Sequence, residues 1–102
     1  MAKAVLIPKE QITALCLKFE VTSLAIFGSA TREDFDPNTS DFDFLVEFSN
    51  TLKPGYSDRY LGLAEGLEKL LGRKVDLLTT RSLKNPYLIS RIESEKIQVY
   101  AA

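Results

Sequence analysis

Three aspartates are the residues of this chain best suited to chemistry. Asp41 and Asp43 open an apolar run with one residue between them, and Asp76 interrupts a later apolar run. Alternation along a strand would place the first two carboxylates on one face, roughly 6 to 7 Å apart. Two like charges at that separation repel each other unless a cation lies between them. Mg²⁺ favours carboxylate and phosphate oxygens, so the pair predicts a magnesium site that works together with a phosphate-bearing substrate.

Each of these acids also has a purely structural explanation. Asp41 and Asp43 could simply end a strand in solvent. A buried and unpaired Asp76 would cost several kcal/mol, so this residue needs a partner. The partner is a neighbouring cation, Arg73 or Lys74, another surface cation if this face of the strand is exposed, or the metal of a three-carboxylate cluster.

A Gly-Ser pair, Gly28-Ser29, follows a short apolar run and is the second candidate part of a site. Glycine lets the backbone approach a ligand closely, while the next N–H groups and the serine hydroxyl can point at an anion. The pair therefore predicts a phosphate cradle, although the same two residues are common in ordinary turns.

Composition narrows the chemistry further. The 102 residues include no histidine, so acid/base or metal chemistry must use carboxylates. Thirteen Lys and Arg against 14 Asp and Glu give a formal net charge of −1, and nucleic acid is therefore not expected as the main partner. The single cysteine, Cys16, cannot form an internal disulfide, and no signal-peptide or membrane-spanning pattern is found. We expect one domain, residues 1–102, in the cytoplasm and without a membrane partner.

The hydrophobic pattern predicts the elements that must position these residues. Helices are expected over residues 8–20, from Tyr60 to Leu71 with Gly72 ending the helix, and after Asn85-Pro86 with Leu88, Ile89 and Ile92 on one side. Strands are expected over 23–27, 41–48 and 73–79, with a short edge strand over 97–100. This order predicts an α/β (α+β) fold with a small mixed β-sheet and helices mainly on one face, while the order of the strands stays open.

Taken together, Gly28-Ser29, Asp41-Phe42-Asp43 and Asp76 resemble the motif of the DNA polymerase beta-like nucleotidyltransferase superfamily. That motif is Gly-Ser, a polar spacer, Asp-x-Asp and a third acid on a later strand. More narrowly, residues 24–78 resemble the minimal nucleotidyltransferase (MNT) domain. Two departures are present: Thr31-Arg32-Glu33 stands where the group commonly has Ala-Arg-Gly, and the spacer is slightly longer. Arg32 still matches the family arginine.

The resemblance implies the nucleotidyltransferase (polymerase beta-like) fold and a Mg²⁺-dependent transfer of AMP from ATP to a hydroxyl. Asp41 and Asp43 would hold two Mg²⁺ ions, and Asp76 would ligate the second ion and accept the hydroxyl proton. These three aspartates would be the catalytic and metal-binding residues. The nucleotide-binding residues would be Gly28, Ser29 and Arg32.

The resemblance also implies a protein partner. Stand-alone MNT domains pair with a HEPN-domain protein, an RNase toxin, and act as its antitoxin, in some cases by adenylylating a tyrosine of the toxin. We therefore expect the same role here. The aromatic residues that could meet such a partner are Phe35, Tyr56, Tyr60, Tyr87 and Tyr100.

Three other functions fit the same residues. The chain could be a non-catalytic antitoxin that masks its toxin by binding alone. It could transfer a nucleotide to a small molecule such as an antibiotic, which its size disfavours unless a homo-oligomer builds the acceptor cleft. It could also be a structural domain in which the acids coincide by chance.

Overall fold

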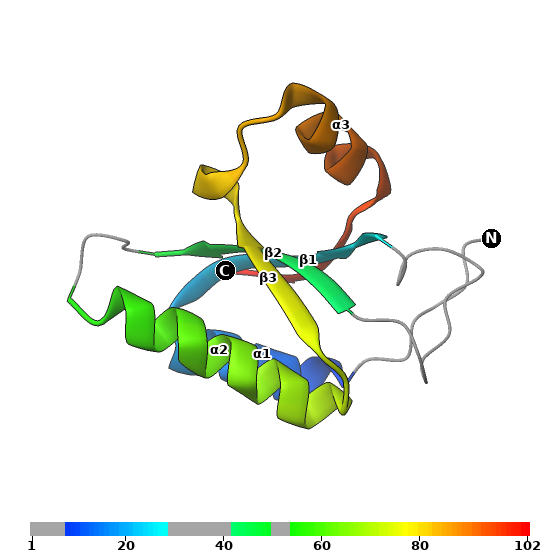
Figure 1. The fold of residues 1–102 in the computed structure, drawn as a ribbon. Coiled ribbons are helices and arrows are strands. Elements are labelled where there is room, and N and C mark those ends of the chain that lie inside the picture. The colour runs from blue at the N-terminus through cyan, green and yellow to red at the C-terminus, as the bar shows by residue number, and fades with distance from the viewer. Residues whose placement is uncertain (1–7, 29–41, 50–53) are drawn as a thin grey trace.

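The computed structural model describes residues 8–28, 42–49 and 54–102, and all structural statements below concern these residues (Figure 1). Their helices and strands follow the predicted order, and a short 3₁₀ helix is added. The helices are α1 (Lys9–Lys18), α2 (Tyr56–Leu71), the 3₁₀ helix η2 (Thr80–Ser82) and α3 (Pro86–Glu95). The strands are β1 (Val21–Phe27), β2 (Phe42–Phe48), β3 (Val75–Thr79) and β4 (Ile97–Ala101).

The ends of several helices and strands differ from the prediction. Helix α1 ends at Lys18 rather than at residue 20, because Glu20 takes a left-handed conformation with φ of 60° and turns the chain into β1. Helix α2 begins at Tyr56, one turn before the predicted Tyr60, and its polar first turn hid this start in the hydrophobic pattern. Strand β3 begins at Val75, two residues later than predicted.

The described strands form one mixed sheet in the order β3-β2-β1-β4, which settles the strand order that the sequence left open. Strand β1 pairs antiparallel with β2 and with β4, whereas β2 and β3 are parallel. A parallel pair needs a crossover connection, and α2 provides it. The expected edge strand is thus confirmed as β4.

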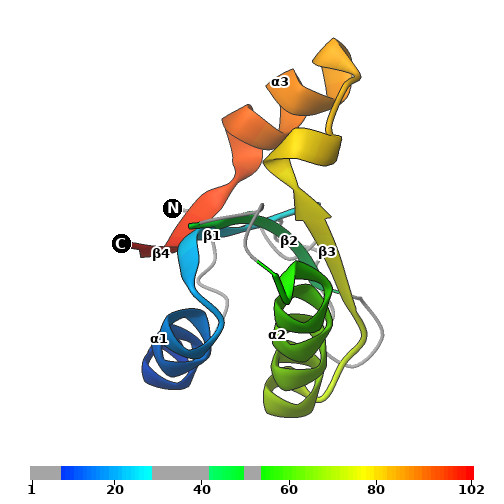
Figure 2. The ribbon, with the colours of Figure 1, turned by 90° about the vertical axis from the view of Figure 1, so that its left-hand side faces the viewer.

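Helices α1 and α2 lie side by side on one face of the sheet, and α3 lies on the opposite face (Figures 1 and 2). This arrangement confirms the prediction of helices mainly on one face. The larger core fills the space between the sheet and the two helices. It includes the alternate residues of β2 that were expected to share a face, namely Phe42, Phe44, Val46 and Phe48.

Helix α3 buries only part of its apolar side against the sheet. Ile92 is buried against Phe27 and Leu45, but Leu88 and Ile89 are exposed. The predicted helix with these three apolar residues is present, but only Ile92 of the three is buried. Only the C-terminal half of α3 approaches the sheet, since the chain passes from Glu95 almost directly into β4. None of the helices in the described ranges is long and apolar enough to span a membrane.

Candidate functional site

The structure brings two of the three predicted carboxylates together. Asp43 in β2 and Asp76 in β3 are register partners in the parallel strand pair. Neighbouring strands lie about 4.8 Å apart, and register partners point to the same face. That face is the one covered by α3, because Leu45 and Leu78, two residues further along each strand, contact the core beneath that helix. Asp41, the third predicted carboxylate, lies outside the described residues.

The two carboxylates differ in exposure. Asp43 is half-buried, whereas Asp76 is exposed although its neighbours Val75 and Leu77 are buried. Of the two cases that the sequence left open, the exposed one holds, because strand alternation turns the Asp76 side chain to water. No ion pair between Asp76 and a basic side chain is recorded in the described part of the chain.

Gly28, the residue that follows β1, packs against the carboxylate of Asp43. Its φ of +76° lies in the left-handed region that favours glycine. A Cβ atom at this position would lie 2.5 Å from Oδ2 of Asp43, which is closer than real Cβ contacts. The positive φ therefore favours glycine, and an added Cβ would force the Asp43 carboxylate to move. Ser29 and Arg32, the other predicted nucleotide-binding residues, lie outside the described residues.

Another acidic residue, Glu95, contacts Gly28 and was missed from the sequence. The N–H of Gly28 donates a hydrogen bond of 3.0 Å to Oε1 of Glu95, the last residue of α3. In the sequence, Glu95 is only one of several charges on an amphipathic helix. The contact can be predicted only once Ile26 is known to pair with Ile97, because the same antiparallel register then sets residue 95 opposite Gly28.

The described donor set suits a hard cation. Asp43 and Asp76 offer carboxylate oxygens on one face, and Mg²⁺ prefers such ligands. Within the ranges that the structure describes, no group of three or more His, Cys, Asp or Glu side chains comes close enough to hold a metal ion. The two described carboxylates fit Mg²⁺ as part of a larger donor set.

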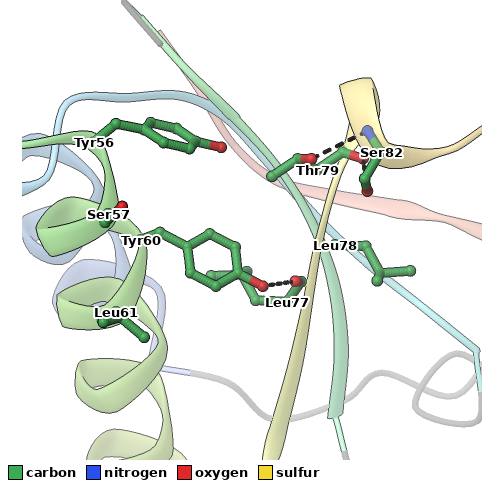
Figure 3. Close-up of a pocket in the computed structure, with 8 residues that line it drawn as sticks. All are labelled: Tyr56, Ser57, Tyr60, Leu61, Leu77, Leu78, Thr79 and Ser82. Atoms are coloured by element: carbon green, nitrogen blue, oxygen red, sulfur yellow. Dashed lines mark hydrogen bonds between the residues drawn. The ribbon is translucent and has the colours of Figure 1, made fainter. Parts of the chain in front are cut away.

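A mostly apolar groove of about 470 Å³ runs beside β3 (Figure 3). The Tyr60 hydroxyl donates a hydrogen bond to the carbonyl oxygen of Leu77, the residue that follows Asp76. Burial raises the pKa of Tyr60, and the nearby Tyr56 and Asp76 raise it further, so the hydroxyl keeps its proton. The groove is lined by Tyr56, Ser57, Tyr60, Leu61, Leu77, Leu78, Thr79 and Ser82.

Of the aromatic residues predicted to meet a partner, Tyr87 on α3 is by far the most exposed, at 86%. Tyr56, Tyr60 and Tyr100 pack partly against the larger core, and Phe35 lies outside the described residues. Tyr87 stands near the exposed Leu88 and Ile89 on the same helix.

Comparison with known proteins gives a consistent result. The family model described as "Nucleotidyltransferase domain" matches residues 8–99. A Methanocaldococcus jannaschii protein, named as a candidate protein adenylyltransferase, is 46% identical over 82 residues that cover 80% of each chain. The solved structure of a candidate minimal nucleotidyltransferase is 30% identical, with a TM-score of 0.70 over 87% of this chain and 86% of that chain.

A third similarity is to a solved complex of a tri-AMPylated Shewanella oneidensis HEPN toxin with an MNT antitoxin. One chain of that complex aligns with a TM-score of 0.62 at 23% identity, over 92% of this chain and 70% of that chain. At this identity the likeness shows the fold alone.

Proposed function

Because the chain belongs to the nucleotidyltransferase domain family, we propose that it transfers AMP from ATP to a tyrosine of a partner HEPN toxin and so acts as an antitoxin. The observation that carries the proposal is the register pair of Asp43 and Asp76 beside the Gly28 turn. A protein as the acceptor is supported by the name of the Methanocaldococcus jannaschii relative, and a HEPN toxin by the composition of the Shewanella oneidensis complex.

In the reaction, an acceptor oxygen bonds to the α-phosphorus of ATP while the bond from that phosphorus to the β-phosphate bridging oxygen breaks, and pyrophosphate leaves. Asp41, Asp43 and Asp76 would hold two Mg²⁺ ions, which when bound neutralise phosphate charge and lower the pKa of the acceptor hydroxyl. Asp76 takes the hydroxyl proton. Gly28 forms the turn that leads to Ser29, whose hydroxyl, together with Arg32, binds the phosphates.

The placement of Asp76 suits an acceptor that is itself a protein. Strand β3 ends the described sheet at one side, so Asp76 lies at an edge rather than in its centre. Asp76 is also exposed, whereas Asp43 is half-buried one strand further in. A tyrosine presented by a partner surface can therefore reach Asp76 without entering a deep pocket.

The direct test is intact mass spectrometry of the HEPN-domain protein encoded next to this chain, after incubation with the chain, ATP and Mg²⁺. An AMP-sized mass gain is expected, and Asp43→Asn or Asp76→Asn should abolish it. If Asp76 takes the proton, Asp76→Asn should still bind ATP and fail only in transfer. A wild-type chain that forms a stable complex with the toxin but adds no mass would contradict the proposal.

That contrary result would favour a second candidate function, masking of the toxin by contact alone. One observation supports it, namely the exposed apolar side chains of Tyr87, Leu88 and Ile89 on the outer helix α3. The RNase activity of the toxin after removal of this chain distinguishes the two functions. A toxin that was only masked should become active again, whereas an AMP-modified toxin should stay inactive.

A further inference from the structure

The hydrogen bond between Gly28 and Glu95 joins the first strand to the end of the last helix, 67 residues apart. The pairing of β1 with β4 explains why these two residues meet. Strand β4 begins at Ile97, opposite Ile26, so β1 continues past the end of its neighbour. The same register sets residue 95 opposite Gly28, and the N–H of Gly28 donates its hydrogen bond to the carboxylate of Glu95.

Glu95 is held in place by its own surroundings. Ile92, three residues earlier and thus on the same side of α3, is buried in the smaller core. The side chain of Glu95 is 23% exposed, and its Oε2 lies 4.0 Å from Nε of Arg91. An anchored helix thus presents the carboxylate to a fixed point of the sheet.

Gly28 consequently has an acidic group on two sides. Oδ2 of Asp43 would lie 2.5 Å from an added Cβ, and Oε1 of Glu95 accepts from the Gly28 N–H. Because the Gly28 N–H donates to Glu95, this N–H is engaged by the protein itself. The hydrogen bond thus ties the Gly28 backbone to α3 at the place where Gly28 meets Asp43.

We propose that Glu95 is a positioning residue for nucleotidyl transfer, which acts by holding Gly28 against Asp43 through the hydrogen bond to the Gly28 N–H. This inference rests on the proposed function, since Glu95 acts on the transfer only through Gly28 and Asp43. Without the hydrogen bond the turn after β1 can shift, and Asp43, whose carboxylate packs on Gly28, loses its fixed place. Small displacements at such a site reduce transfer strongly.

The structural part of the proposal can be tested without any activity. With ¹⁵N-glycine labelling, the five glycines of the chain give five amide signals whose hydrogen exchange can be followed separately. The Gly28 amide should be protected in the wild type and in Glu95→Gln, whose amide oxygen can still accept, and unprotected in Glu95→Ala. An unprotected wild-type Gly28 would overturn the proposal, whatever the chain does with ATP.

The functional part uses transfer of AMP to the neighbouring HEPN-domain protein. Glu95→Ala should lower kcat at least tenfold and raise the Mg²⁺ concentration needed for half-maximal rate, while Glu95→Gln stays within about threefold of the wild type. Glu93→Ala is the matched control, because Glu93 is at the same end of α3 but pairs with Lys96 at 2.8 Å and not with Gly28. It should behave as wild type.

Three results would overturn the assignment. They are an unchanged kcat and Mg²⁺ requirement in Glu95→Ala, an equal loss in Glu93→Ala, and a Glu95→Gln variant as poor as Glu95→Ala. If Glu95→Ala does not fold, Glu95→Asp replaces it, because the shorter side chain keeps the charge but cannot reach Gly28. A wild-type chain with a protected Gly28 amide but no transfer would reject the proposed function and leave the Gly28 contact standing.

Discussion

Asp43 and Asp76 are direct neighbours across two parallel strands, on the face of the sheet that α3 covers. The parallel direction of β2 and β3 is what makes them neighbours, and it follows from the crossover through α2. Like charges at paired positions destabilise a sheet by a few tenths of a kcal/mol up to about 1 kcal/mol. The two side chains therefore repel each other across this pair, and a cation bound between them would reduce that repulsion.

The first prediction concerns this repulsion and uses Asp76→Asn. In the presence of EDTA the variant should melt at the same temperature as the wild type or slightly above it, because about 0.5 kcal/mol of repulsion is removed. Added Mg²⁺ should raise the melting temperature of the wild type, and this increase should be largely lost in the variant. Differential scanning fluorimetry with and without Mg²⁺ measures both effects.

Glu47→Gln is the control for Asp76→Asn. Glu47 is an exposed acid near the far end of β2, well away from the Asp43 position along the strand. Its replacement should leave the Mg²⁺-dependent increase intact. If both variants keep the full increase, Mg²⁺ does not bind at the paired aspartates.

The order of elements and the faces of β2 could be predicted because they depend on local periodicity. Alternating Phe42, Phe44 and Val46 must bury one face of any sheet, and the structure confirms this. Periodicity carries no information on which strands pair. The antiparallel pairing of β1 with β4 therefore had to come from the structure.

The residues of the candidate site were likewise only partly predictable from the sequence. The sequence located Asp43, Asp76 and Gly28 by residue type and spacing, and the structure places these three together. It could not locate Glu95, since the contact depends on where β4 begins. It also left the burial of Asp76 open, because an apolar run in the sequence does not tell which residues of an edge strand face water.

The second prediction compares Gly28→Ala with Gly72→Ala. Both glycines have positive φ, +76° and +69°, so each alanine costs about 1 kcal/mol in backbone strain. At Gly72 nothing lies within 4 Å of the added Cβ, whereas at Gly28 the Cβ would meet Oδ2 of Asp43. We expect Gly28→Ala to cost at least about 1 kcal/mol more, in urea unfolding, and to lose transfer activity.

Gly72→Ala should retain that activity, since Gly72 ends α2 away from Asp43. Equal stability losses and equal activities in the two variants would show that the contact between Gly28 and Asp43 has no consequence.

The third prediction concerns the Tyr60 hydroxyl, which donates to the carbonyl oxygen of Leu77 (Figure 3). Tyr60→Phe keeps the ring but leaves that carbonyl without this donor, so the variant should be about 1 kcal/mol less stable. Tyr56→Phe is the matched control, because no hydrogen bond of the Tyr56 hydroxyl is recorded among the described residues and its ring packs edge-on against Phe48. Chemical denaturation of both variants measures the difference, and equal midpoints would refute the prediction.

The last prediction concerns pH and the buried thiol of Cys16. Burial raises the pKa of Cys16 from its ordinary 9.0 to about 11. Between these values the unfolded chain loses the thiol proton while the folded chain keeps it, so the free energy of unfolding must fall as pH rises. The loss should be roughly 1 kcal/mol at pH 10 and approach about 3 kcal/mol above pH 11. Below pH 9 no loss is expected from this group. Urea unfolding of the wild type and Cys16→Ala at pH 8, 9 and 10 isolates the effect, because Tyr60 titrates in both proteins. If the difference in stability between the two proteins is the same at all three pH values, the thiol does not ionise on unfolding in this range and the explanation fails.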